Sequence, residues 1–98
     1  MYEIRRTERF SNWLDRLRDA KVRARILARL DRVAGGSFGD SQPLGESVSE
    51  FRIHYGPGYR VCYTIRHRTI VVLLVGGIKS TQERDIRRAI EMARRLEE

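Results

Sequence analysis

The chain has 98 residues, of which 41% are hydrophobic and 34% charged, and its formal net charge is +7. This length suits one domain with one core over residues 1–98, and the share of apolar residues excludes wholesale disorder. The longest apolar run, residues 70–78, is too short to span a bilayer, and residues 1–10 lack the apolar core of a signal peptide. We therefore expect a cytoplasmic protein with no membrane-spanning segment.

The positive charge comes from 18 arginines and two lysines. The guanidinium group of arginine matches phosphate geometry and stacks on bases, which the ammonium group of lysine does not. The composition therefore indicates a nucleic acid or an acidic protein as partner, and the alternative is a basic surface exposed to water. The single cysteine excludes an internal disulfide, which fits a reducing cytoplasm.

The first third of the chain is predicted to form a strand and two helices. Residues 2–6 alternate in polarity as a short strand does, and Thr7 is the predicted N-cap of the first helix. The apolar stripe of that helix consists of Phe10, Trp13, Leu14 and Leu17. Asp19 is the predicted N-cap of a second helix over residues 20–34, which Gly35 ends.

The second helix has two different faces. Its inward face consists of Val22, Ile26, Leu30 and Val33, and its outer face carries Lys21, Arg25, Arg29 and Arg32. We call the outer set the basic ridge. It is either solvated or in contact with RNA phosphates.

Residues 37–47 are rich in glycine, serine and proline, so they are predicted to form a loop. Three strands should follow, over residues 48–55, 59–66 and 69–79. The third is almost continuously aliphatic, so we expect it inside the sheet with both faces covered.

Ser80 is predicted to open the last helix, where Glu83 completes a capping box. The buried stripe of this helix consists of Ile86, Ala89, Ile90, Ala93 and Leu96. The order of elements is then β-α-α-β-β-β-α. Sequential antiparallel strands with helices packed on them predict a small α+β domain with a mainly antiparallel sheet.

The hairpin over residues 51–63 has an apolar and a polar face. The apolar side chains are Phe51, Ile53 and Tyr55 on one strand and Tyr59, Val61 and Tyr63 on the next. A Gly-Pro-Gly loop that pairs Tyr55 with Tyr59 brings these sets together. The same register sets His54 opposite Arg60 and Arg52 opposite Cys62 on the polar face.

The polar face is expected to gather further cations. If Arg60 lies opposite Val75, Lys79 shares its face beside the Gly-Pro-Gly turn, and Gln82 lies close by on the last helix. Such cations repel one another unless an anion joins them. The face is therefore either an anion-binding site or an open, solvated surface.

Several other chemistries find no support. Two histidines and one cysteine give no zinc-binding spacing, and the glycines match no phosphate-binding loop or dinucleotide fingerprint. The carboxylates are scattered, so we predict no metal site and no cofactor. Cys62 is either a nucleophile beside His54 and Arg52 or a filler residue on a strand.

Four motifs along the chain carry a family resemblance. They are FxxWLxxL at 10–17, FGD at 38–40, GPGYRV at 56–61 and GGxKxxQxxDI at 76–86. In these motifs the chain resembles addiction-module killer proteins, the HigB-like toxins of the RelE/ParE superfamily. The resemblance implies a compact α+β toxin neutralised by a cognate antitoxin, often a helix-turn-helix DNA-binding protein. Many superfamily members cut mRNA on the ribosome, whereas the ParE branch inhibits DNA gyrase.

The resemblance also implies roles for individual residues. Arg60 matches the phosphate-binding arginine of the superfamily, and Arg52 and His54 fall where RelE-type enzymes carry basic strand residues. Lys79 and Gln82 match polar positions at the strand end and the helix start.

The chain departs from the family pattern at two places. No tyrosine or histidine follows His67, although classical RelE has a catalytic tyrosine near its C-terminus. Cys62 stands where close relatives often have tyrosine. The remaining residues suit attack of an RNA 2′-hydroxyl on its adjacent phosphate, which needs proton transfer and charge stabilisation but no metal.

We therefore interpret the chain as the toxin of a type II toxin-antitoxin module, a metal-independent and ribosome-dependent mRNA endonuclease. The expected catalytic residues are Arg60, His54 and Lys79, and the expected substrate-binding residues are Arg52, Gln82 and Tyr59. The expected partners are mRNA, the ribosome and a cognate antitoxin. Two alternatives remain open: a ParE-like gyrase inhibitor that cuts nothing, and a non-toxic basic nucleic-acid-binding module.

Overall fold

The computed structural model describes residues 1–96, which form the predicted order of elements with one strand added. The strands are β1 (Glu3–Arg6), β2 (Ser41–Gly45), β3 (Val48–Ile53), β4 (Tyr59–Arg66) and β5 (Ile70–Ile78). The helices are α1 (Glu8–Arg16), α2 (Ala20–Ala34) and α3 (Gln82–Leu96), and a 3₁₀ turn, Lys79–Thr81, precedes α3. Within residues 1–96, none of the helices has both the length and the apolar character needed to cross a membrane.

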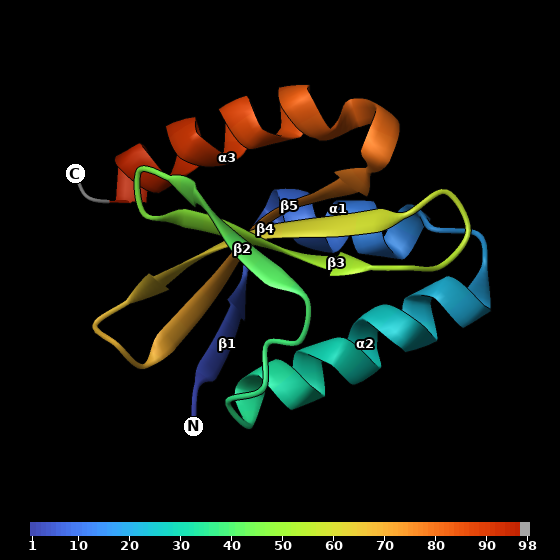
Figure 1. The fold of residues 1–98 in the computed structure, drawn as a ribbon, viewed down its shortest axis with the longest axis horizontal. Helices are drawn as coiled ribbons and strands as arrows, with labels where there is room; N and C mark the ends of the chain where they lie inside the picture. Colours follow the sequence, from blue (N-terminus) through green and yellow to red (C-terminus); the bar gives the residue numbers. More distant parts are fainter. Residues whose placement is uncertain (97–98) are drawn as a thin grey trace.

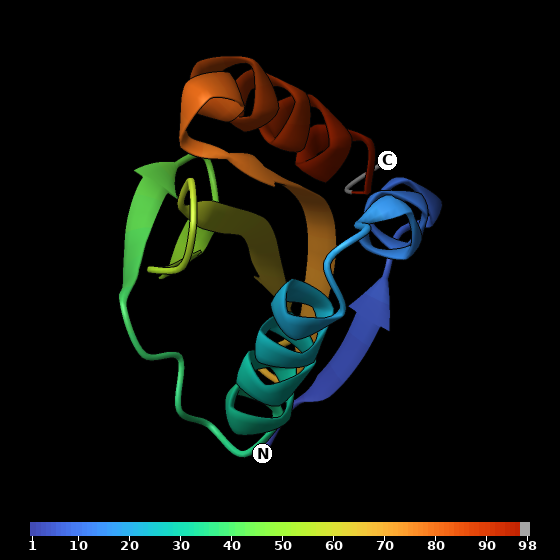
Figure 2. The ribbon, with the colours of Figure 1, turned by 90° about the vertical axis from the view of Figure 1, so that its right-hand side faces the viewer.

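The five strands form one sheet in the order β1-β5-β4-β3-β2. β1 runs parallel to β5, and the other neighbours are antiparallel. Helices α1 and α2 cover one face of the sheet and α3 covers the other (Figures 1 and 2). The α+β class with a mainly antiparallel sheet is therefore confirmed, as is the position of β5 inside the sheet.

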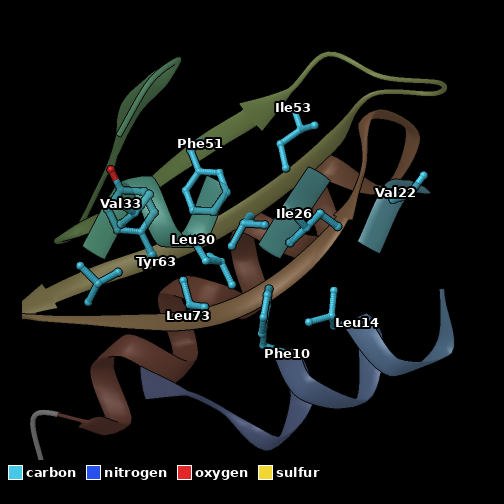
Figure 3. Close-up of a cluster of buried hydrophobic side chains, with 12 residues drawn as sticks. Phe10, Leu14, Val22, Ile26, Leu30, Val33, Phe51, Ile53, Tyr63 and Leu73 are labelled. Atoms are coloured by element: carbon cyan, nitrogen blue, oxygen red, sulfur yellow. The ribbon is translucent and has the colours of Figure 1, made fainter. Parts of the chain in front are cut away.

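The larger core lies between the sheet and helices α1 and α2 (Figure 3). The helices contribute the predicted buried positions Phe10, Leu14, Val22, Ile26, Leu30 and Val33. The sheet contributes Phe51, Ile53, Val61, Tyr63, Val71 and Leu73. Full burial of each large apolar side chain stabilises the fold by roughly 1.5–3 kcal/mol, so this side contributes most of the hydrophobic stabilisation.

The smaller core lies beneath α3 and depends on a β-bulge. Cys62 pairs with Val75 and Tyr63 pairs with Leu73, so Leu74 is an extra residue in β5. As a result both Leu74 and Val75 pack toward α3. The helix presents the small residues Ala89 and Ala93 to this core.

The predicted N-caps of α1 and α2 are confirmed. Thr7 Oγ1 accepts a hydrogen bond from the Phe10 N–H at 3.0 Å, and Asp19 Oδ1 accepts one from the Lys21 N–H at 2.8 Å. The expected cap of the last helix is wrong. The side chain that reaches back is Thr81, whose Oγ1 accepts from the Ile78 N–H at 3.3 Å. This contact folds the 3₁₀ turn, so α3 begins two residues after Ser80.

The hairpin register differs from the prediction by two residues. Ile53 pairs with Tyr59 and Arg52 with Arg60, so residues 54–58 all belong to the connection. The turn closes earlier than predicted because the Gly58 N–H donates to the Tyr55 carbonyl at 3.1 Å, with Gly58 at φ 79°. A shift of two residues leaves each side chain on its predicted face, since strand side chains alternate.

Two further expectations need correction. Arg60 pairs with Gly77 and not with Val75, again a shift of two residues. Within the predicted loop 37–47, residues Ser41–Gly45 form strand β2 beside β3. Composition suggested a loop because of Pro43, but an edge strand tolerates proline where no hydrogen bond is needed from its nitrogen.

Candidate functional site

The polar edge of the α3-facing side is organised around Glu50 of β3, whose exposed fraction is 0%. Glu50 Oε1 accepts hydrogen bonds from Arg60 Nη1 at 2.7 Å, from Gln42 Nε2 at 3.0 Å and from Gln82 Nε2 at 3.0 Å. The carboxylate therefore joins β2, β3, β4 and the first turn of α3. We call these four residues the Glu50 network.

Burial explains why this carboxylate gathers so many donors. Removing a carboxylate from water is costly unless it is paired and hydrogen-bonded. The side chain of Arg60 is 16% exposed and supplies the opposite charge. Glu50 Oε2 and Arg60 Nε are buried and have no hydrogen-bond partner within residues 1–96. The network thus holds Arg60 in one position, with these two polar atoms shielded from solvent.

A second network surrounds Asp40, which precedes β2. Arg52 Nη2 donates to Asp40 Oδ1 at 2.7 Å, and His54 Nε2 contacts Asp40 Oδ2. The Arg52 N–H also donates to the Asp40 carbonyl at 2.8 Å, which fixes the loop against β3. The hydrogen bond from Arg52, followed by that from His54, lowers the pKa of Asp40 to about 2. We call these three residues the Asp40 network.

Cations clustered on one sheet face repel one another unless an anion lies among them, and the two networks show which anions do. The protein itself supplies the anions, Glu50 and Asp40, which the sequence analysis did not single out. Both had a signal. Glu50 alternates with Arg52 on the polar face, and Asp40 ends the FGD motif.

The structure brings most of the predicted site residues together. Arg52 and Arg60 are cross-strand neighbours on β3 and β4. Gln82, the first residue of α3, donates to Glu50 and so joins the same group. His54, whose side chain is 76% exposed, joins through Asp40. Lys79 is exposed, and its backbone N–H donates to the Gly58 carbonyl at 3.1 Å, so it lies beside the turn as expected.

Tyr59 lies apart from these residues. It is half-buried on the opposite face of the sheet, where its ring centroid is 6.5 Å from that of Trp13. The sheet therefore separates its ring from the Glu50 network.

Gly76 and Gly77 let both helical layers approach β5. A Cβ on Gly76 would lie 2.2 Å from the Trp13 ring, and one on Gly77 would lie 1.9 Å from Asp85 Oδ2. Neither position has room for a side chain. The glycines of the GGxKxxQxxDI motif thus place Trp13 on one face and the start of α3 on the other.

The environment of Cys62 decides between its two interpretations. The side chain is 3% exposed, and burial first, then the charges of Glu50 and Asp85, raises its pKa to about 12. A thiol that stays protonated and is shielded from solvent is a poor nucleophile. The geometry favours the filler role.

Part of the basic ridge on α2 has structural contacts. Arg25 lies over the Tyr55 ring, 4.2 Å from its centroid, and Arg29 donates to the carbonyls of Phe38 (3.2 Å) and Arg52. Burial and the neighbouring charge of Arg32 lower the pKa of Arg29. As for metals, residues 1–96 contain no group of three or more His, Cys, Asp or Glu side chains placed to hold an ion.

A family model described as Phage derived protein Gp49-like (DUF891) matches residues 12–98. The chain belongs to this Gp49-like family. The Gp49-like protein is also 39% identical over 94 residues to an uncharacterized protein of Haemophilus influenzae, a match that covers 96% of this chain and 95% of the relative.

Solved structures share the fold of this Gp49-like protein at low sequence identity. A mutant of the E. coli toxin RelE in the free state matches with a TM-score of 0.73 and 18% identity, over 93% of this chain and 96% of that one. A chain of the intact E. coli RelBE toxin-antitoxin complex matches with a TM-score of 0.66 and 18% identity, over 80% of this chain and 96% of that one. At such identity the likeness establishes the fold alone.

Proposed function

We propose that this Gp49-like protein is the toxin of a type II toxin-antitoxin module, of the HigB-like branch, and that it cleaves mRNA on the ribosome without a metal. The RelE-like fold, the basic composition and the motif resemblance support this proposal. Its cognate antitoxin, which we expect to be a helix-turn-helix protein encoded beside it, neutralises it by binding.

The observation that carries the proposal is the carboxylate of Asp40 held between a guanidinium and an imidazole. A carboxylate and a phosphodiester both present two oxygens that share one negative charge, so side chains that bind one with charge-assisted hydrogen bonds can also bind the other. Asp40 precedes an edge strand and its side chain is 35% exposed, so a competing anion can displace this carboxylate from Arg52 and His54. In our proposal the scissile phosphate replaces Asp40 between Arg52 and His54.

Each site residue then has a defined role. The guanidinium of Arg60, fixed by Glu50, and the ammonium of Lys79 stabilise the extra negative charge of the phosphorane transition state. His54, which lies beside the proposed phosphate position through its contact with Asp40, exchanges the proton of the attacking 2′-hydroxyl or of the leaving oxygen.

The predicted substrate-binding residues have different shares in this proposal. Arg52 binds the phosphate directly. Gln82 acts through Glu50, by completing the hydrogen bonds that position Arg60. In our proposal a base stacks on the half-buried ring of Tyr59, which lies beside Gly56 of the turn.

A second candidate is the ParE-like inhibition of DNA gyrase without nuclease activity. One observation favours it: Arg60 and Arg52 both have internal carboxylate partners, so neither is free in the isolated protein. No histidine or tyrosine after His67 supplies another acid or base.

A translation assay with purified protein separates the two candidates. We expect truncated mRNA in a reconstituted translation system, the same products in EDTA when ribosome integrity is controlled, and unchanged gyrase supercoiling. Lys79→Ala should suppress cleavage about a hundredfold or more, whereas Lys21→Ala, a change at an exposed lysine of the basic ridge, should not. Intact mRNA together with inhibited gyrase would reject the nuclease in favour of the inhibitor.

A further inference from the structure

A groove of about 730 Å³ runs between α1 and α3 and is not part of the site described above. Its floor is β5, at Gly76, and the ring of Trp13. Arginines line its walls, namely Arg9 and Arg16 from α1 and Arg84 and Arg88 from α3. A neighbouring hollow shares three of them and extends the groove along α3 to Arg87 and Arg95.

Three arginines on the walls of this groove lack the internal partners that the site arginines have, whereas Arg87 and Arg95 in its extension pair with Glu83 and Glu91. Arg9, Arg16 and Arg88 are exposed and make no ion pair or side-chain hydrogen bond with any residue of 1–96. Arg84 reaches Asp85 only at 3.9 Å. The four wall arginines outnumber the two carboxylates of the lining, Glu8 and Asp85, so the groove presents an excess of positive charge.

We propose that this groove docks an acidic amphipathic helix of a partner protein, with an apolar side chain of that helix seated against Trp13. The two walls are helices, and a helix laid between them places one face on the floor and its flanks against the arginines. Tryptophan and arginine are the residues on which binding energy concentrates at protein interfaces. The inference rests on the proposed function, since it assigns the helix to the antitoxin.

The composition of the walls favours a protein over RNA. Glu8 and Asp85 lie among the arginines, and Glu91 lies farther along α3. An RNA strand carries a negative charge at every nucleotide and would meet these carboxylates with repulsion. A peptide can leave a neutral or basic residue opposite each of them.

The fluorescence of Trp13, the sole tryptophan, reports directly on the floor of the groove. The probe is a synthetic tryptophan-free helical peptide of about 15 residues, or four turns, with glutamates on one face and leucines on the other. A lysine-for-glutamate version and a single-stranded oligouridylate serve as comparisons. We expect the acidic peptide alone to shift Trp13 emission and to bind saturably by anisotropy of a fluorescein label.

Charge reversal locates the binding. Arg9→Glu/Arg88→Glu should weaken the acidic peptide at least about tenfold, and the milder Arg9→Gln/Arg88→Gln should weaken it less. Lys21→Glu/Arg68→Glu removes the same net charge at exposed positions elsewhere and should change affinity little. Circular dichroism confirms that each variant is folded.

Three results would overturn the inference: no change in Trp13 emission, equal weakening by the control pair, or tighter binding of oligouridylate that the groove variants abolish. The peptide assay does not measure toxicity, so its result remains valid even if the toxin proposal fails. Conversely, a protein that arrests growth and is still neutralised when it carries Arg9→Glu/Arg88→Glu retains the proposed function and loses this inference.

Discussion

Arginine serves opposite electrostatic purposes in two regions of this molecule. In the Glu50 and Asp40 networks, each guanidinium meets a carboxylate of the chain at 2.7 Å. In the groove between α1 and α3, Arg9, Arg16 and Arg88 meet none within residues 1–96. Burial accounts for the difference, because a guanidinium withdrawn from water needs a counter-charge whereas one in water does not. A net charge of +7 therefore says little until the paired arginines are separated from the unpaired ones.

The largest expected effect comes from removing the buried anion. Glu50→Ala leaves Arg60 without its counter-charge and opens a cavity, so it should lower the free energy of unfolding by about 3–5 kcal/mol. Glu83→Ala breaks an exposed pair with Arg87 and should cost at most about 0.5 kcal/mol. Urea denaturation of both variants measures the contrast. Similar losses for the two variants would remove the distinction between buried and exposed pairs.

A smaller effect should follow from filling the floor of the groove. The Cβ of Gly76→Ala would lie 2.2 Å from the Trp13 ring, so the ring or α1 must move. We expect a loss of about 1–3 kcal/mol and a shifted Trp13 emission. Gly35→Ala, whose Cβ would meet nothing closer than 3.5 Å, should leave both unchanged. An unaltered emission spectrum in Gly76→Ala would mean that Trp13 is not seated on this glycine.

The Asp40 network should produce the smallest effect, visible only in acid. Its folded-state pKa of about 2 lies below the ordinary value of 3.8, so folding favours the ionised form. That stabilisation is fully present above about pH 5, where the carboxyl is ionised in the unfolded chain too, and it is lost as the pH falls through about 2. The difference in Tm between wild type and Asp40→Asn should therefore shrink over this interval. A difference that stays constant from pH 6 to pH 2 would contradict the pairing.

Sequence periodicity predicted correctly which side chains lie on each face of the hairpin, but it did not predict which residues pair across the two strands. Phe51, Ile53 and Val61 lie on the predicted face because alternation depends only on the strand itself. Register depends on where the turn closes, and the Gly58–Tyr55 hydrogen bond placed it two residues away from the predicted pairing. The same limit hid β2, because an edge strand with a proline has the composition of a loop.

The site was predictable in its cations and not in its anions. The GPGYRV motif pointed to Arg60, and the alternation of the hairpin strand pointed to Arg52 and His54; the fold gathers all three on one edge. Alternation with Arg52 places Glu50 on the polar face, but nothing in the sequence shows that this carboxylate is fully buried. Only the packing of β2 and α3 over β3 reveals it. The groove was hidden for a related reason, since α1 and α3 are far apart along the chain.

The most direct test of the account asks whether the paired and unpaired arginines have separable functions. Arg60→Lys keeps a positive charge beside Glu50 but loses the guanidinium fork, and Arg9→Glu/Arg88→Glu alters only the groove. Each variant is assayed for mRNA cleavage in the reconstituted system and for inhibition of that cleavage by the adjacent gene's product. We predict that Arg60→Lys loses cleavage on the order of a hundredfold but still binds the inhibitor, whereas Arg9→Glu/Arg88→Glu cleaves normally and escapes inhibition. Full cleavage by a folded Arg60→Lys protein, or loss of cleavage in the groove variant, would contradict the division.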